Sequence, residues 1–126
     1  MATSPSATRS VTNPLLHILK DTLAASVRSD ETDLSARQLT VFLKVYMEPG
    51  TEHTVRGLAA DLNISKPGIT RALDRLEEFD LAKRAKDPSD GRSVIVKNTS
   101  KGTTYLGTLN GYLNAADKQA RNSAAR

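Results

Sequence analysis

The fold is decided by residues 54–79, which read TVRGLAADLNISKPGITRALDRLEEF. Thr54 and Ser65 can each cap a helix by accepting backbone N–H bonds, and Pro67 suits the first turn of the second helix. Asn63 tolerates the left-handed conformation that ends a helix, so only a tight turn separates the two. The predicted inner face of both helices is apolar, with Leu58, Ala59, Leu62, Ile69, Leu73, Leu76 and Phe79. This pattern predicts a helix-turn-helix over 54–79.

The segment that follows, 81–98, changes from helical spacing to short strand-like runs. Leu81–Lys86 and Ser93–Lys97 are the predicted strands, and the turn-rich Asp87–Arg92 lies between them. They predict a β-hairpin, or wing, directly after the helix-turn-helix. The predicted fold class is therefore mainly α with a small β-hairpin wing (α+β), a winged helix-turn-helix.

Further helices are predicted on both sides of this motif. Helix 14–27 follows the cap Asn13, and a second helix begins at Ser35, where Gln38 completes a capping box. A last helix is predicted over 100–116. The apolar stripe of the first helix consists of Leu15, Leu16, Leu19, Leu23 and Val27. The stripe of the last consists of Tyr105, Leu106, Leu109, Tyr112, Leu113 and Ala116.

The predicted domain organisation is one winged-helix domain over 13–116. Residues 1–12 are short of apolar side chains and are expected to form a disordered tail. Residues 117–126 turn polar and are expected to fray.

Composition excludes several classes of protein. The chain has no Cys, so it forms no disulfide, thiolate zinc site or cysteine-based oxidant sensor. Its two histidines, His17 and His53, stand apart without ligand-spaced partners. We expect no metal, no cofactor, no catalytic residue and no enzyme activity. No apolar run is long enough to cross a bilayer, so the expected location is the cytoplasm, in association with the nucleoid. The net charge of +4 permits a polyanionic partner.

The second helix of the motif, 66–79, is the one expected to enter the major groove of DNA. Arg71 can donate two hydrogen bonds to a guanine, and Thr70 can contact a thymine methyl group or a phosphate. Lys66 and Arg75 are placed to bind phosphates, which gives affinity without sequence choice. The residues predicted on the outer face are Ser65, Lys66, Pro67, Gly68, Thr70, Arg71, Asp74 and Arg75.

Two other features complete the predicted interface. Pro67 and Gly68 are expected to let the helix backbone approach the groove closely. In the wing, Arg92 lies at the turn 87–92, where a long cation can enter the minor groove. Asp90 is expected to pair with Arg92 and to hold its direction.

The stretch 34–102 resembles the MarR family of bacterial winged-helix transcription regulators. The likeness is carried by LAADLNIS (58–65) with ITRALDRL (69–76), and more particularly by DPSDGR (87–92) followed by TSKG (99–102). The resemblance implies homodimers whose terminal helices form the interface, each subunit reading half of an inverted repeat. It also implies that a small acidic or aromatic ligand releases the DNA.

The chain departs from the family pattern in two places. Asn98 stands where members usually have an apolar residue, and a single predicted C-terminal helix stands where members usually have two long ones. The sequence is therefore interpreted as a short, C-terminally reduced member.

Two functions remain open from the sequence. The first is sequence-specific binding of double-stranded DNA by a homodimer formed through helices 14–27 and 100–116. The alternative is a winged-helix protein-interaction module, such as an antirepressor or a complex subunit, without sequence-specific DNA binding. Glu77, Glu78 and Asp80 favour the alternative, because acidic side chains at the end of the reading helix would repel phosphate.

Overall fold

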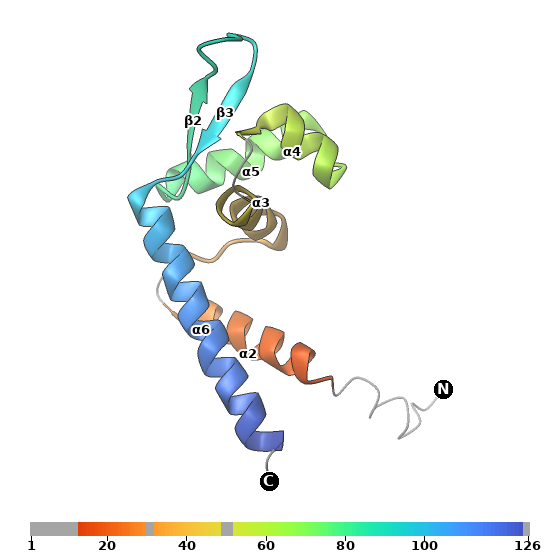
Figure 1. The fold of residues 1–126 in the computed structure, drawn as a ribbon, viewed down its shortest axis with the longest axis vertical. Coiled ribbons are helices and arrows are strands. Elements are labelled where there is room, and N and C mark those ends of the chain that lie inside the picture. Colours follow the sequence, from red (N-terminus) through yellow and green to blue (C-terminus); the bar gives the residue numbers. More distant parts are fainter. Residues whose placement is uncertain (1–12, 30–31, 49–51, 125–126) are drawn as a thin grey trace, which may run out of the picture. The chain divides into compact units, whose positions relative to one another are not determined.

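The computed structural model describes residues 13–29, 32–48 and 52–124 (Figure 1). In chain order its elements are α2 (Pro14–Arg28), α3 (Ala36–Met47), β1 (His53–Thr54), α4 (Val55–Leu62), α5 (Lys66–Glu78), β2 (Lys83–Lys86), β3 (Val94–Lys97) and α6 (Ser100–Ala124). Helices dominate, and the three strands form one antiparallel sheet. The predicted fold class is confirmed. The predicted tail 1–12 lies outside the described residues.

The chain divides into two compact units. The central unit is Leu34–Leu106, and the terminal unit contains the described residues before Leu34 and after Leu106. We predicted one domain over 13–116, whereas this division falls inside α6. The helix-turn-helix and the wing both belong to the central unit.

The helix starts in the central unit follow local capping chemistry. Ser35 accepts the N–H of Gln38 while the Gln38 side chain accepts the N–H of Ser35, which completes the predicted capping box. Thr54 and Ser65 cap α4 and α5 by accepting the N–H three residues on. Asn63 ends α4 with φ 54° and ψ 45°, the predicted left-handed conformation. These caps place α4 and α5 as the two helices of the motif.

The sheet has the order β1-β3-β2, so the central strand is β3. In the wing, Ala85 of β2 lies opposite Ile95 of β3. The strand β1 was not predicted, and it pairs His53 with Val96 and Thr54 with Ile95. A strand of only two residues has no recognisable sequence pattern, so β1 can be identified only from its pairing with β3 in the structure.

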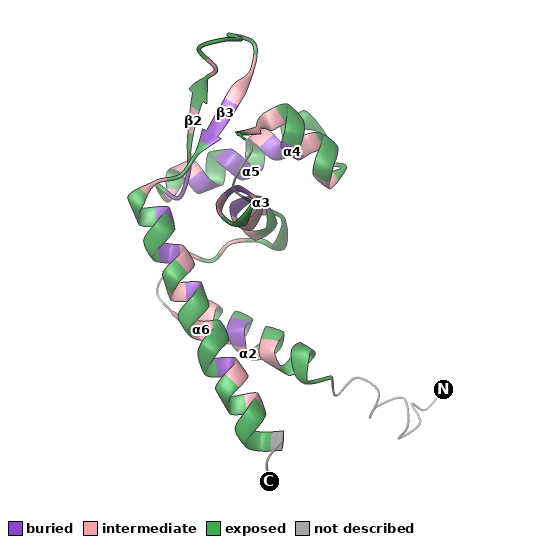
Figure 2. Ribbon diagram, viewed as in Figure 1, coloured by how far each residue is buried: buried purple, intermediate pink, exposed green. Residues whose placement is uncertain are grey.

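The apolar faces of the central unit meet in a closed core. Both α3 and α4 pack against α5, and Figure 2 shows buried segments on these helices and on β3. Phe42 stacks on Tyr46 and meets Tyr105 edge to face. The buried apolar side chains are Val41, Phe42, Val45, Leu58, Ile69, Ala72, Leu73, Leu76, Leu81, Ala82, Ile95, Val96 and Tyr105. This core fixes α5 by its inner face and leaves the opposite face to solvent.

A hydrogen-bonded junction joins α3 to the start of α6. The hydroxyl of Tyr46 donates to the carbonyl of Leu81 at 2.7 Å and accepts the N–H of Thr99 at 2.9 Å. Gly102 makes room for this hydroxyl, because a Cβ there would lie 1.7 Å from Tyr46 Oη. Thr99 in turn accepts the N–H of Gly102 and so caps α6. The segment 99–102 therefore has a structural role.

The terminal unit leaves much of its apolar surface open. Asn13 caps α2 as predicted, by accepting the N–H of Leu15 at 2.8 Å. Every side chain of the predicted stripe on α2 is exposed, and the exposed fractions range between 41% for Leu23 and 71% for Leu15. A stripe of this kind is typical of a surface that another surface covers.

The last helix is longer than predicted. α6 continues to Ala124, where we expected fraying after residue 116. The added segment contains Ala, Lys, Gln and Arg, which favour helix, and an ion pair of 2.9 Å joins Asp117 to Arg121 one turn on. Among the described residues, no helix is apolar enough over a sufficient length to span a membrane.

Candidate nucleic-acid interface

The outer face of α5 presents most of the predicted reading residues to solvent. Ser65, Lys66, Pro67, Arg71 and Arg75 are exposed, and Thr70 is half-buried. Within the described part of the chain, neither Lys66 nor Arg71 forms an ion pair. These two cations therefore need not break an internal contact in order to bind an anion.

Gly68 is placed differently from the prediction. It is buried, and a Cβ at this position would lie 2.6 Å from Cγ2 of Ile64. Its lack of a side chain serves the close packing of the turn before α5, and its predicted exposure on the reading face is wrong. The sequence signal was ambiguous, since both a ligand and a neighbouring side chain can require glycine.

Arg75 is engaged at the end of α5. Its guanidinium lies 4.5 Å above the centre of the Phe79 ring and 3.4 Å from a carboxylate oxygen of Glu78. Stacking on an aromatic face and pairing with a carboxylate limit the directions that an arginine can take. Arg75 thus remains exposed, but its side chain is held along the helix.

Two aspartates shape the turn of the wing. Asp87 accepts the backbone N–H and the hydroxyl of Ser89 at 2.9 and 2.8 Å, and these bonds lower the pKa of the Asp87 carboxyl. Asp90 accepts the backbone N–H of Arg92 and the hydroxyl of Ser93. The predicted Asp90–Arg92 pair is therefore a bond to the backbone and not to the guanidinium, so Asp90 orients the turn while the Arg92 side chain stays exposed.

A shallow hollow of about 390 Å³ lies between α5 and the wing. Its lining includes Thr70 from α5 and Arg84, Lys86 and Val94 from the strands. Thr70 was predicted to contact DNA, whereas Lys86 was not considered because the strands carried no motif. The hollow brings a hydroxyl and a cation together beside the reading face.

Arg84 connects the wing to α5. Its Nη2 lies 2.5 Å from Oδ1 of Asp74, and its Nε donates to Oε1 of Glu77. Partial burial lowers the pKa of Arg84, but the bonds to the two carboxylates outweigh that effect and the net shift is upward. The guanidinium is a permanent cation between two carboxylates of α5.

Arg37 is another cation that the sequence reasoning missed. It lies at the start of α3, and its Nη1 would be 3.4 Å from a Cβ on Gly68. The side chain therefore reaches the first turn of α5 near Gly68, where the Ser65 hydroxyl also lies. Its position depends on the packing of α3 against α5, which no local motif reports.

Residues 32–93 match the family model described as MarR family. This segment is therefore similar to the MarR family. It contains α3 to β2 and the turn of the wing, and so all the residues proposed for the interface. The predicted resemblance is confirmed for this segment. A comparison with curated proteins gives no match.

Solved structures with the MarR-family fold resemble the chain over most of its length. A MepR mutant from a multidrug-resistant S. aureus clinical isolate has a TM-score of 0.76 at 16% identity, covering 97% of this chain and 84% of its own. The transcriptional regulator Tm0710 from Thermotoga maritima has a TM-score of 0.68 at 16% identity, covering 96% and 79%. Overoxidized AbfR bound to DNA has a TM-score of 0.60 at 20% identity, covering 87% and 75%. At these identities the likeness concerns the fold.

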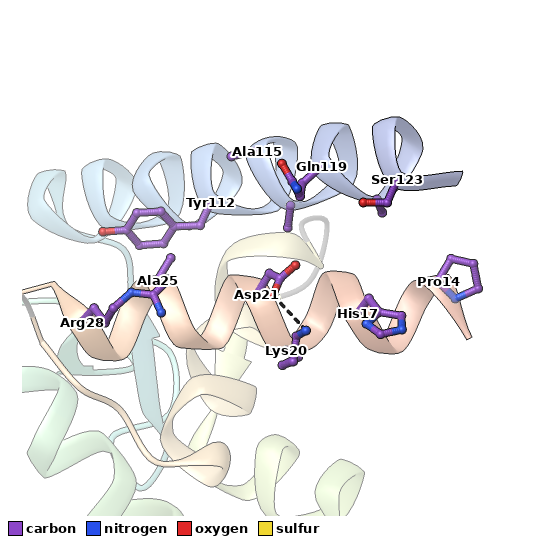
Figure 3. Close-up of a pocket in the computed structure, with 12 residues that line it drawn as sticks. Pro14, His17, Lys20, Asp21, Ala25, Arg28, Tyr112, Ala115, Gln119 and Ser123 are labelled. Carbon is purple, nitrogen blue, oxygen red and sulfur yellow. Dashed lines mark ion pairs between the residues drawn. The ribbon is translucent and has the colours of Figure 1, made fainter. Parts of the chain in front are cut away.

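A separate groove of about 800 Å³ lies within the terminal unit, between α2 and α6 (Figure 3). His17, Lys20 and Tyr112 are among its lining residues, and Lys20 pairs with the neighbouring Asp21 at 3.3 Å. None of the residues proposed for the interface lines it. Among the described residues no cluster of His, Asp or Glu is arranged to hold a metal ion.

Proposed function

We propose that this chain is a sequence-specific transcription regulator that binds double-stranded DNA. In this proposal α5, over 66–79, enters the major groove, and the turn 87–92 of the wing touches the minor groove. The observation that carries the proposal is the two-sided character of α5. Ile69, Leu73 and Leu76 are fully buried on its inner face, while Lys66 and Arg71 are exposed on the other side.

The proposed contacts follow from this geometry. Arg71 is the candidate for bidentate bonds to guanine, and Lys66 and Arg75 are candidates for phosphate contacts. Arg92 is the candidate minor-groove cation, on a turn whose backbone Asp90 orients. Ser65, Pro67 and Thr70 complete the surface that approaches the duplex, and Gly68 supports it through packing.

The proposal includes a homodimer on an inverted repeat. Helix 14–27 carries five large apolar side chains that are 41–71% exposed, and Leu113 in helix 100–116 is 43% exposed. A second copy of the chain would remove this surface from water, and two-fold symmetry of the protein would match the symmetry of the DNA site. The comparisons include a MarR-fold protein bound to DNA, AbfR, which supports DNA as the partner.

The test uses an operator selected from randomised duplexes and a scrambled duplex of the same length. Arg71→Ala is expected to reduce discrimination between them by about 1–3 kcal/mol, roughly a 5- to 150-fold change. Arg92→Ala is expected to weaken binding to both duplexes alike. Arg121→Ala, an exposed arginine at the far end of α6, is the matched control and should change neither affinity.

Two results would contradict the proposal. Unchanged discrimination by the Arg71→Ala protein would remove α5 as the reader. No binding at low salt would favour the alternative, a protein-interaction module, because phosphate contacts are strongest there. The acidic residues behind that alternative are partly neutralised, since Arg84 pairs with Glu77 and Arg75 pairs with Glu78.

Two further parts of the hypothesis rest on composition, for the location, and on the family resemblance, for the effector. A cytoplasmic, nucleoid-associated location and an acidic or aromatic effector that releases DNA stay predictions. Purified protein titrated with small aromatic acids while bound to its operator would test the effector.

A further inference from the structure

The two carboxylates that meet Arg84 lie on the reading side of α5. Thr70, Asp74 and Glu77 follow one another at intervals of four and three residues, so they share one face of the helix. Thr70 and Arg84 also line the same hollow between α5 and the wing. Asp74 and Glu77 thus stand close to the surface that the proposed function assigns to DNA.

Without compensation, these carboxylates would oppose that function. Two negative charges on one helix face repel a phosphate backbone, and the repulsion acts over several ångströms at low ionic strength. In the structure both carboxylates are bonded to the same guanidinium, whose side chain is 24% exposed. The bonds from Nε and Nη2 to two different carboxylates fix the direction of the guanidinium toward α5.

We propose that Arg84 is a positioning residue for DNA binding. It neutralises Asp74 and Glu77 and holds strand β2 of the wing against α5, without contacting a base or a phosphate itself. This inference rests on the proposed function. It assigns a role to the cluster of Arg84, Asp74 and Glu77, which the proposed DNA contacts do not involve.

The experiment compares four full-length proteins on one selected operator, at low and at moderate salt. They are the wild type, Arg84→Gln, the double variant Asp74→Asn/Glu77→Gln, and the triple variant that combines all three changes. Arg84→Gln is expected to bind about tenfold more weakly at low salt, and the deficit should shrink as salt screens the exposed carboxylates. The triple variant is expected to bind within about threefold of the double variant, because no uncompensated charge remains.

A thermal unfolding curve of each protein separates folding from binding. Arg84→Lys provides a second variant that retains the charge but cannot bridge two carboxylates with one planar fork. It is expected to recover most of the affinity that Arg84→Gln loses. A triple variant that binds as weakly as Arg84→Gln would overturn the inference, since it would mean that Arg84 contacts DNA or acts only on stability.

Other outcomes are equally decisive. An Arg84→Gln protein that binds the operator with wild-type affinity would overturn the inference but not the proposed function. An Arg84→Lys protein that binds the operator as weakly as Arg84→Gln would have the same consequence. A wild type that binds no duplex at low salt would overturn the proposed function and the inference with it. The wild-type measurement therefore tells the two failures apart.

Discussion

The helices α2 and α5 have similar apolar patterns and opposite surroundings. On α5 of the central unit, Ile69, Leu73 and Leu76 are completely buried. On α2 of the terminal unit, Leu15 and Val27 are 71% and 62% exposed. A stripe at helical spacing therefore shows that a face is built to be covered, but it does not show which surface covers it. The central unit supplies its own cover, whereas the stripe of α2 is open.

The largest difference between the two faces should appear on truncation of a leucine. Leu73→Ala is expected to lower the free energy of unfolding by about 3 kcal/mol at any protein concentration, because it leaves a cavity in the core. Leu19→Ala is expected to weaken self-association instead, so its loss of stability should be largest at high protein concentration and should vanish at dilutions where both proteins are monomeric. Denaturant unfolding at two concentrations, together with sedimentation velocity, would measure both.

Two results would contradict this contrast between the covered face of α5 and the open face of α2. A wild-type protein that sediments as a monomer at micromolar concentration would leave the stripe of α2 without its proposed partner. A concentration-dependent loss in the Leu73→Ala protein would mean that the central unit is not closed by itself.

Two glycines of α6 allow the same contrast between a packed and an open position to be tested within one helix. Gly102→Ala is expected to cost about 2 kcal/mol, because its Cβ would meet Tyr46 Oη at 1.7 Å and the Leu81 carbonyl at 2.6 Å. Gly107→Ala is the matched control, since no atom lies within 4 Å of its Cβ. It should stabilise the helix by up to about 1 kcal/mol. Equal melting temperatures for the two proteins would refute the junction around Tyr46.

A smaller gain is expected at the end of α5. Asp80 has φ 58°, a left-handed conformation that follows the helix, and the N–H of Leu81 returns to the carbonyl of Leu76. Asp80→Gly should therefore raise the free energy of unfolding by less than about 1 kcal/mol, since glycine adopts this conformation without a steric penalty. Chemical denaturation would detect the gain, and a clear loss would show that the Asp80 side chain stabilises the turn.

The smallest effect is expected in the wing, which lies in the central unit but outside its core. Hydrogen bonds from Ser89 lower the pKa of Asp87 below its ordinary value of 3.8, so their contribution is complete above that pH. It is lost as pH falls through the lowered pKa of the folded state. The Ser89 amide, followed by NMR during an acid titration, should shift with a midpoint below 3.8. A midpoint at or above that value would contradict these bonds.

The elements that were predicted from the sequence are those set by neighbouring residues. Helix caps involve residues only three or four positions apart, so the sequence alone predicted those at Ser35, Thr54, Asn63 and Ser65. The stripe of α5 was visible for the same reason. The β-hairpin was predicted because its strands are joined by only a short turn.

The features that escaped prediction depend on contacts between distant segments. Strand β1 exists because His53 meets Val96, and the hollow exists because Arg84 and Lys86 lie across from Thr70. Gly68 has the residue type expected at a DNA-facing turn, yet Ile64 occupies the space beside it. The predicted exposure was therefore correct for the cations Lys66, Arg71, Arg75 and Arg92 and wrong for Gly68, whose place depends on packing.

The tip of the wing offers room for change. A side chain on Gly91 would meet no atom within 4 Å, while Asp87 and Asp90, which precede it, already fix the turn. A larger side chain at this point would therefore not disturb the rest of the molecule. Changes in side-chain size can therefore accumulate at the tip and leave the hydrophobic core unaltered.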